Sequence, residues 1–114
     1  MKRAYNMKSR NGNPVTNQII IEEYLGNNSD GYYTELIFQS YGVTIAILTK
    51  NEDRNYNGSV TNDYLTLDKD NWDYSRTTLR YLNKFINENT EFNTNTAKIR
   101  KLIKNDIIEL SDLN

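Results

Sequence analysis

The sequence contains no cysteine and no histidine among its 114 residues. Without cysteine there is no disulfide framework, no thiolate nucleophile, no cysteine-based zinc site and no iron–sulfur cluster. Without histidine there is no imidazole base, no Ser-His-Asp triad and no neutral nitrogen ligand for zinc or copper. We therefore expect a protein that is not an enzyme and that holds neither a cofactor nor a metal.

Long apolar runs and a strong charge imbalance are also missing. No apolar run approaches the roughly 18–20 residues that span a bilayer, and no apolar segment follows the basic N-terminus as in a secretory signal. We therefore expect no membrane contact and a cytoplasmic location. The formal net charge of −1 favours neither a DNA mimic nor a protein that coats nucleic acid.

Charge is nonetheless unevenly distributed along a chain that has the length of one domain of about 100–150 residues. The first ten residues carry basic side chains and no acidic ones, and residues 98–104 repeat that pattern. Acidic side chains gather between these two segments. We predict a single domain over residues 1–114, with a basic N-terminal segment, residues 1–13, that can be extended.

Four segments have the residue pattern of β-strands. Residues 15–25 mix β-branched and aromatic side chains, and residues 32–39 alternate between two faces. Residues 43–50 are apolar on both faces, which favours a central strand, and residues 60–67 resume strand character. Because no helical pattern intervenes, the four segments predict an antiparallel meander.

Turn signals separate these segments. Residues 26–31 are dense in glycine and asparagine, and residues 51–59 form a polar loop. Gly42 interrupts the chain between the second and third segments. It predicts either a hairpin with a three-residue loop and a left-handed glycine, or a bulge inside one long strand.

The hydrophobic period changes to that of a helix after Asp70. Residues 75–87 form an amphipathic pattern, with Ser75 as a natural N-cap. A second, shorter helix is predicted over residues 96–104, capped by Thr94 or Thr96.

The chain after the second helix predicts a return to the sheet. Asn105 can end that helix in the left-handed conformation, and residues 107–110 are apolar enough for a last strand or an apolar tail. The expected fold is α+β in the order ββββααβ, with an antiparallel sheet of four to five strands and two helices packed on one face.

The segment from Trp72 to Thr78 is the most distinctive in the chain. It concentrates the only tryptophan, a tyrosine, three hydroxyls, an acid and an arginine at a helix start. One interpretation is an anion site formed by the helix N-terminus with Arg76 and the hydroxyls of Ser75, Thr77 and Thr78. The structural alternative is that Asp73 and Ser75 cap the helix, while Trp72 and Tyr74 pin it to the sheet and Tyr74 packs on Leu79.

A basic stripe runs along the first predicted helix. Arg76, Arg80 and Lys84 are spaced i, i+4 and i+8, which places them on one side of a helix. Lys98 and Lys101, with neighbouring Arg100 and Lys104, give a second basic surface on the next helix. The two surfaces predict contact with phosphates or with an acidic protein surface, unless they are solvated helix faces.

Tyrosine and aspartate supply the remaining candidate sites. Tyrosine is enriched at protein interfaces, and among the nine tyrosines we expect Tyr33 and Tyr56 to be exposed and to contact a partner. Asp68, Asp70 and Asp73 superficially resemble a calcium loop. The glycine and the bidentate glutamate that such a loop requires are missing, so we expect no metal there.

Five short stretches of the chain are characteristic in combination: Asn17-Gln18, Phe38-Gln39-Ser40-Tyr41, Ile45-Ala46, Trp72 to Thr78 and Leu113-Asn114. Together they resemble a family of small proteins carried by phages and related mobile elements of low-GC Gram-positive bacteria. Only the tryptophan-containing stretch is specific, although the resemblance covers nearly the whole chain. The resemblance implies a context, because such proteins often counter host defences and anti-CRISPR inhibitors are the largest such group. It transfers no catalytic residue.

These observations lead to two functional hypotheses. The first is a non-enzymatic binding protein of a phage or mobile element that blocks a host macromolecule, with a CRISPR effector nuclease as the candidate, by steric and electrostatic occlusion. The alternative is a small phage accessory protein that binds nucleic acid directly through its basic helices. An enzyme is the weakest hypothesis, because the chain offers no evident general base.

Overall fold

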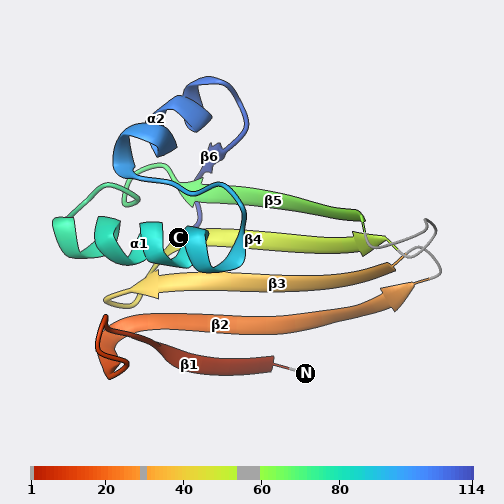
Figure 1. Cartoon of the computed structure of the whole chain (residues 1–114), viewed down its shortest axis with the longest axis horizontal. Helices are drawn as coiled ribbons and strands as arrows, with labels where there is room; N and C mark the ends of the chain where they lie inside the picture. The colour runs from red at the N-terminus through yellow and green to blue at the C-terminus, as the bar shows by residue number, and fades with distance from the viewer. Residues whose placement is uncertain (1, 29–30, 54–59) are drawn as a thin grey trace.

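The computed structural model describes residues 2–28, 31–53 and 60–114. These residues form one sheet, with α1 against it and running roughly along the strands, and with α2 near β6 (Figure 1). The fold is α+β, as the sequence predicts. The elements are β1 (Lys2–Lys8), β2 (Pro14–Asn28), β3 (Gly31–Ser40), β4 (Val43–Asp53), β5 (Val60–Asp68), α1 (Arg76–Asn89), α2 (Thr96–Lys104) and β6 (Glu109–Ser111).

The sheet has the strand order β1-β2-β3-β4-β5-β6. Each neighbouring pair from β1 to β5 is antiparallel, whereas β6 pairs with β5 in parallel. The parallel pair arises because the two helices carry the chain back before it re-enters the sheet. The predicted sheet of four to five antiparallel strands is therefore correct in outline, and the structure adds β1 and the parallel direction of β6.

β1 is the strand that the residue pattern does not reveal. Only Met7 of its seven residues is buried, so the segment shows neither an apolar run nor an alternation. Charged side chains are usual on an edge strand, where they discourage pairing with another chain. An exposed ion pair of 2.8 Å between Arg3 and Glu22 links β1 to β2. The extended state predicted for the N-terminal segment is thus a paired strand over most of its length.

Two predicted turns are shorter than the sequence indicated. Gly26 lies opposite Tyr33 within the β2–β3 pair, and β4 continues to Asp53. The neighbouring strand supplies backbone hydrogen-bond partners, which outweigh the low strand propensity of glycine and asparagine. Residues 29–30 and 54–59, the remainder of these predicted turns, lie outside the described residues.

The connection between β3 and β4 is a hairpin of two residues, Tyr41 and Gly42. Ser40 pairs with Val43, and φ is 53° at Tyr41 and 79° at Gly42. Positive φ at both central residues is the geometry of a type I′ turn. The predicted hairpin with a left-handed glycine is confirmed, in a loop shorter by one residue. The bulge lies instead at Ile45, where the register with β3 shifts.

The core lies between the helices and one face of the sheet. Alternate positions of the central strands are completely buried, as at Phe38 and Leu48. Phe85 of α1 stacks on Phe38, with ring centroids 5.7 Å apart. Ile99 of α2 is also completely buried in the same cluster. Both helices therefore pack on the sheet through one common core.

The two helices begin at different kinds of cap. The Thr78 backbone N–H donates to Ser75 Oγ at 3.1 Å, which confirms Ser75 as the N-cap of α1. At α2 the Lys98 backbone N–H donates to Asn95 Oδ1 at 2.8 Å. The predicted cap at Thr94 or Thr96 is therefore wrong. Thr94 is buried and hydrogen-bonded to side chains of α1 instead.

The end of α2 also differs from the prediction. Asn105 has φ of −92°, and the left-handed residue is Asp106, with φ of 59°. The Ile107 backbone N–H donates to the Leu102 carbonyl at 2.9 Å, which completes a Schellman-type ending. Among the described residues, neither helix is long and apolar enough to cross a membrane.

Candidate functional site

Two of the three cations in the basic stripe of α1 are available to contact a partner. Arg76 and Arg80 are exposed, and neither has an ion-pair partner within the part of the chain that the structure describes. Lys84 is half-buried and its Nζ lies 4.0 Å from Glu88 Oε1. The stripe is therefore positive at the start of α1 and close to neutral toward its end.

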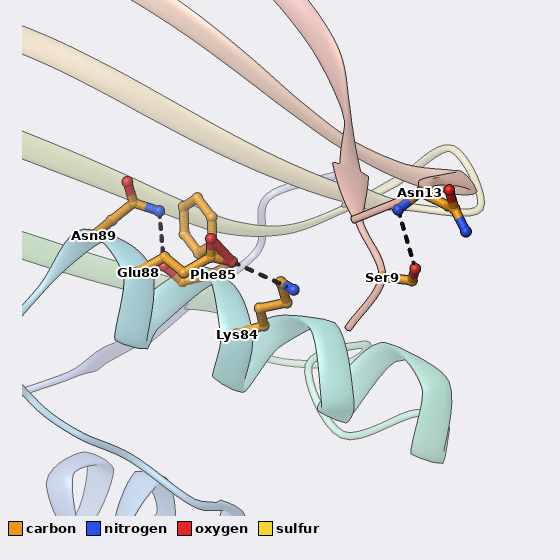
Figure 2. A network of polar contacts seen from close by, with 6 residues as sticks. All are labelled: Ser9, Asn13, Lys84, Phe85, Glu88 and Asn89. Atoms are coloured by element: carbon orange, nitrogen blue, oxygen red, sulfur yellow. Dashed lines mark hydrogen bonds and ion pairs between the residues drawn. The ribbon is translucent and has the colours of Figure 1, made fainter. Parts of the chain in front are cut away.

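Figure 2 shows Lys84 on the side of α1 that turns toward the connection between β1 and β2. In that connection the Asn13 backbone N–H donates to Ser9 Oγ at 3.3 Å. One turn after Lys84, Asn89 Nδ2 donates to the Phe85 carbonyl at 2.8 Å. The contacts of Lys84 with Glu88 and of Asn89 with Phe85 both lie within α1, so these side chains in its C-terminal half are engaged by the helix itself.

The predicted second basic surface, on α2, is only partly available. Lys98 Nζ donates to the Phe92 carbonyl in the loop between the helices. Arg100 lies 3.6 Å from Asp73 and stacks over the Trp72 ring, with 5.0 Å to the ring centroid. Both cations therefore hold parts of the fold together. All four cations of α2 are exposed, and among the described residues only Lys101 and Lys104 have no ion-pair partner and no side-chain hydrogen bond.

The two predicted contact tyrosines do not join the basic stripe. Tyr33 pairs with Asn51 near one end of the sheet, whereas Ser40, at the other end of β3, contacts Thr78 at the start of α1. Tyr33 is 38% exposed. Tyr56 lies outside the described residues.

The Trp72 to Thr78 segment divides into a buried half and an exposed half. Trp72 is buried and anchors the turn before α1, as the structural interpretation expects. Asp73 pairs with Arg100 and does not cap α1. Tyr74 is 80% exposed, so the predicted packing of this ring on Leu79 is wrong. The ring projects instead beside a pocket.

This pocket, which we call the α1 pocket, lies between the start of α1 and the β3–β4 hairpin. Its volume is about 630 Å³. Two of its lining residues, Tyr41 and Tyr74, are strongly exposed tyrosines, at 59% and 80%. Its lining consists of Ser40, Tyr41, Val43, Ile45, Asn71, Tyr74, Ser75, Thr77 and Thr78.

Tyr41 holds its place on the rim in an unfavourable backbone conformation. A left-handed φ costs a residue with a side chain roughly 1–2 kcal/mol, and tyrosine lacks the short polar side chain that eases this cost for asparagine. The Tyr41 backbone N–H donates to the Asn17 carbonyl at 2.8 Å, and Asn17 itself has φ of 69°. Strain of this kind is common at functional sites.

The floor of the α1 pocket is a chain of hydroxyls. Ser75 Oγ donates to Thr78 Oγ1 at 3.0 Å, and Thr78 Oγ1 lies 2.9 Å from Ser40 Oγ. Ser75 and Thr78 are therefore occupied by internal contacts, in contrast to the anion site that the sequence suggested. Next to Ser40 in the β2–β3 register lies Gln18, which is completely buried and whose side-chain amide has no hydrogen-bond partner among the described residues.

Asp68 is a structural carboxylate behind the pocket. Leu113 N–H donates to its Oδ1 at 2.8 Å and Asn71 Nδ2 to its Oδ2 at 2.6 Å. Burial alone would raise the pKa of Asp68, but these hydrogen bonds outweigh it and hold the pKa below its ordinary value. Among the described residues no group of three or more acidic side chains is placed to hold a metal ion.

The α1 pocket could not be found from the residue pattern alone. Tyr41 follows a strand and Tyr74 precedes a helix, and nothing in the local sequence indicates that the two face one site. The sequence did contain an indirect indication of this site. Stretches that carry the family resemblance contact one another at the α1 pocket. Asn17 bonds to Tyr41, and Ser40 contacts Thr78.

Comparisons with known proteins give a family and no activity. No curated protein matches the sequence. No solved structure matches the fold. Residues 3–103 match the family of unknown function DUF8033. This range spans β1 to α2 apart from the first residue of β1 and the last residue of α2, and it includes all residues that line the α1 pocket. The chain belongs to the DUF8033 family.

Proposed function

We propose that this chain is a non-enzymatic binding protein that covers the surface of a host macromolecule and so blocks it. The contact is made by Arg76 and Arg80 of α1, with the exposed ring of Tyr74 as a neighbouring anchor. The observation that carries the proposal is that both arginines are exposed and without an ion-pair partner in the described chain. Arginine and tyrosine are the residue types that dominate binding energy at interfaces.

The partner is a host protein with an acidic surface. Arginines without internal partners add electrostatic complementarity to such a surface and speed association with it. The resemblance to phage and mobile-element proteins supports a proposal in which this binding occurs in the cytoplasm of a bacterial host. It makes a CRISPR effector nuclease the first partner to test.

Direct binding of nucleic acid through both helices has weaker support. Such binding needs several cations free to contact phosphates. Lys84, Lys98 and Arg100 are each engaged within the chain. The remaining cations of the two helices, Arg76, Arg80, Lys101 and Lys104, are too few for a long phosphate track.

The test is charge reversal on α1. In capture experiments from a lysate of a low-GC Gram-positive bacterium, the double variant Arg76→Glu/Arg80→Glu should lose its specific partner at least about tenfold, because two attractive contacts become repulsive. The same variant should lose any protection of phage or plasmid in an interference assay. Its thermal stability should stay nearly unchanged, since both side chains are exposed.

A matched control separates a specific contact from a general charge effect. Lys2→Glu/Lys8→Glu makes the same change in net charge at two exposed positions of the edge strand β1. It should retain the partner. Equal loss in both double variants, or capture that survives reversal on α1, would overturn the proposal. A gel shift of DNA or RNA at low salt that disappears as salt rises would favour the alternative.

A further inference from the structure

The sheet has two outer edges, and the chain protects them differently. The edge strand β1 carries Lys2, Arg3 and Lys8, charged side chains of the kind that discourage pairing with another strand. At the opposite edge, β6 covers only residues 66–68 of β5. Residues 60–65 pair with β4 on their inner side and, within the described chain, with no strand on their outer side. They contain no lysine, arginine or proline. The outer side of residues 60–65, which we call the β5 edge, is therefore an open template for a further strand.

The β5 edge is open because the end of α2 holds the chain away from it. The backbone N–H groups of Ile107 and Ile108 both donate to the Leu102 carbonyl, at 2.9 and 3.1 Å. Their donors are used at the helix end, and β6 begins only at Glu109. Figure 1 shows β6 beside the end of β5 that leads toward α1. An added strand would therefore continue the line of β6 along β5.

A groove with apolar walls lies where β6 and the β5 edge meet. Its volume is about 450 Å³, and it is lined by Tyr64 of β5, Ile103 of α2 and the segment from Asp106 to Leu110. Ile107 and Leu110 are 52% and 38% exposed, which is much for apolar side chains. Exposed apolar side chains that gather beside polar ones are typical of interaction sites. The side chains of a strand added to the β5 edge can bury them.

The charges around this groove are acidic. Asp106 and Glu109 are among the described residues that line it, and no lysine or arginine is. Asp63 of β5 has one carboxylate oxygen, Oδ1, that is buried and accepts no hydrogen bond within the described part of the chain. Its cross-strand neighbour Lys50 donates to the Asn89 carbonyl instead. A buried acceptor without a donor is costly, so this edge favours a partner that brings N–H donors and positive charge.

We infer that the β5 edge takes up an extended segment of a partner protein, which adds a strand in line with β6 and carries basic side chains beside apolar ones. The open backbone edge selects an extended chain, because its N–H and C=O groups pair with the main chain of such a segment. The groove supplies the apolar contact, and the acidic groups select positive charge. This surface goes beyond the proposed function, because neither Arg76 nor Arg80 lines the groove.

The first test uses a capped heptapeptide of alternating lysine and valine, titrated into the isotopically labelled protein. The amides of Tyr64, Leu65 and Ile107 should shift in a saturable way. Hydrogen exchange should slow at the outward amides of β5, because the added strand bonds to them. A matched peptide of glutamate and valine should bind at least about tenfold more weakly, since its charge repels the acidic edge. Equal binding of both peptides, or no localised shift at the β5 edge, overturns the inference.

Backbone methylation of the peptide tests whether it adds as a strand. N-methyl groups on alternate residues remove the N–H donors along one edge of an extended chain. Two such heptapeptides can be made. The one methylated on the edge that faces β5 should lose binding, whereas the other should bind as the parent peptide does. Equal binding of all three peptides would show contact through side chains alone and would contradict strand addition.

Variants test the groove itself. Ile107→Lys replaces an exposed apolar side chain by a cation and should weaken binding of the lysine–valine peptide at least about tenfold. Glu109→Gln removes one charge but can still accept the hydrogen bond that the Tyr64 hydroxyl donates to Glu109, and it should weaken binding severalfold. Tyr74→Lys is the matched control, because it introduces the same charge at an exposed position outside this groove. Unchanged binding in both groove variants, or an equal loss in the control, counts against the inference.

A second copy of this chain is the competing occupant of the β5 edge, since β1 is itself a basic edge strand. Sedimentation of the protein alone tests this. A monomer supports a partner segment, whereas assembly that Ile107→Lys abolishes assigns the edge to a second copy and overturns the inference. Either outcome leaves the capture experiment with Arg76 and Arg80 unaffected, because the peptide tests change neither arginine.

Discussion

Tyr41 occupies a backbone conformation that residues with large side chains seldom adopt, with φ of 53°. The following Gly42 also has positive φ, and Asn-Gly is the residue pair that such a turn prefers. Asp68 is unfavourable for a different reason, because its charged carboxylate is buried. Hydrogen bonds from Leu113 and Asn71 offset the cost of that burial. Tyr41 therefore lowers the stability of the fold through its backbone conformation, whereas Asp68 is stabilised only by the residues that donate hydrogen bonds to it.

Replacing Tyr41 by asparagine should make the protein more stable. Asn tolerates the left-handed conformation, so Tyr41→Asn should raise the free energy of unfolding by about 1 kcal/mol and Tm by about 4 °C. Calorimetry measures both. A Tm lower than that of the wild type would show that the ring contributes packing that outweighs the backbone strain. A gain in stability is the pattern expected of a strained residue that is retained for function.

Acid should remove the stabilising effect of Asp68. Its folded-state pKa lies below the unfolded value of about 3.9, so the carboxylate stabilises the fold fully above that pH and loses its contribution as the pH falls through the folded pKa. Asp68→Asn, which cannot titrate, should be less stable at pH 7 by about 1–3 kcal/mol. Urea unfolding should show this difference constant down to about pH 5 and shrinking below about pH 4. A difference independent of pH would contradict the assignment.

At the scale of elements, α2 depends on its ends and on the linker before it. With nine residues it is shorter than the roughly 12–15 residues at which isolated helices become marginally stable. Asn95 caps its start. Thr94 ties the linker to α1 through Asn83 Oδ1 at 3.0 Å and Asn87 Oδ1 at 3.1 Å. The many asparagines of this chain therefore serve as specific hydrogen-bonding residues as well as loop formers.

Removing the cap of α2 should loosen that helix first. Asn95→Ala should cost about 1 kcal/mol, the usual value of an N-cap. Hydrogen exchange should accelerate at Lys98 and Ile99 before it does in α1. Asn105→Ala is the matched control at the other end of α2, and it should be near neutral because Asn105 has an ordinary negative φ. A larger effect at Asn105 than at Asn95 would contradict this account of the two ends.

At the scale of the whole molecule, one thin core holds all the layers together. Phe38 of the sheet and Phe85 of α1 stack at its centre, both completely buried. Ile99 reaches the same cluster from α2 and Trp72 from the turn before α1. The α1 pocket and the basic stripe are both positioned by this packing, because it fixes α1 on the sheet.

Truncation at the centre of this core should be the most damaging single change. Phe85→Ala should lower the free energy of unfolding by about 3–5 kcal/mol, since it removes a buried ring and leaves a cavity. Phe92→Ala, at a partly buried position in the α1–α2 linker, should cost clearly less. Urea unfolding monitored by Trp72 fluorescence compares the two. Equal losses would show that the core extends further into the linker than the burial pattern indicates.

The central elements were predictable because their side-chain patterns are strong. The alternation at residues 32–39 and the helical period after Ser75 correspond to β3 and α1, and the bounds predicted for α2 match the structure. β1 was missed because a mostly exposed edge strand has no apolar pattern to detect. The cap at Asn95 was missed because several neighbouring residues have suitable side chains, and only the folded backbone selects one of them.

By itself, the sequence determined the fold class, the central strands, the two helices and the placement of Arg76 and Arg80 on one helix side, because each of these follows from periodicity within a short stretch. Tertiary structure alone decided that Arg100 is engaged by Asp73 and by the Trp72 ring. It also brought Tyr41 and Tyr74 to one pocket. Such contacts depend on which residues distant in the chain come together in the sheet and core. A local sequence pattern does not indicate these long-range contacts.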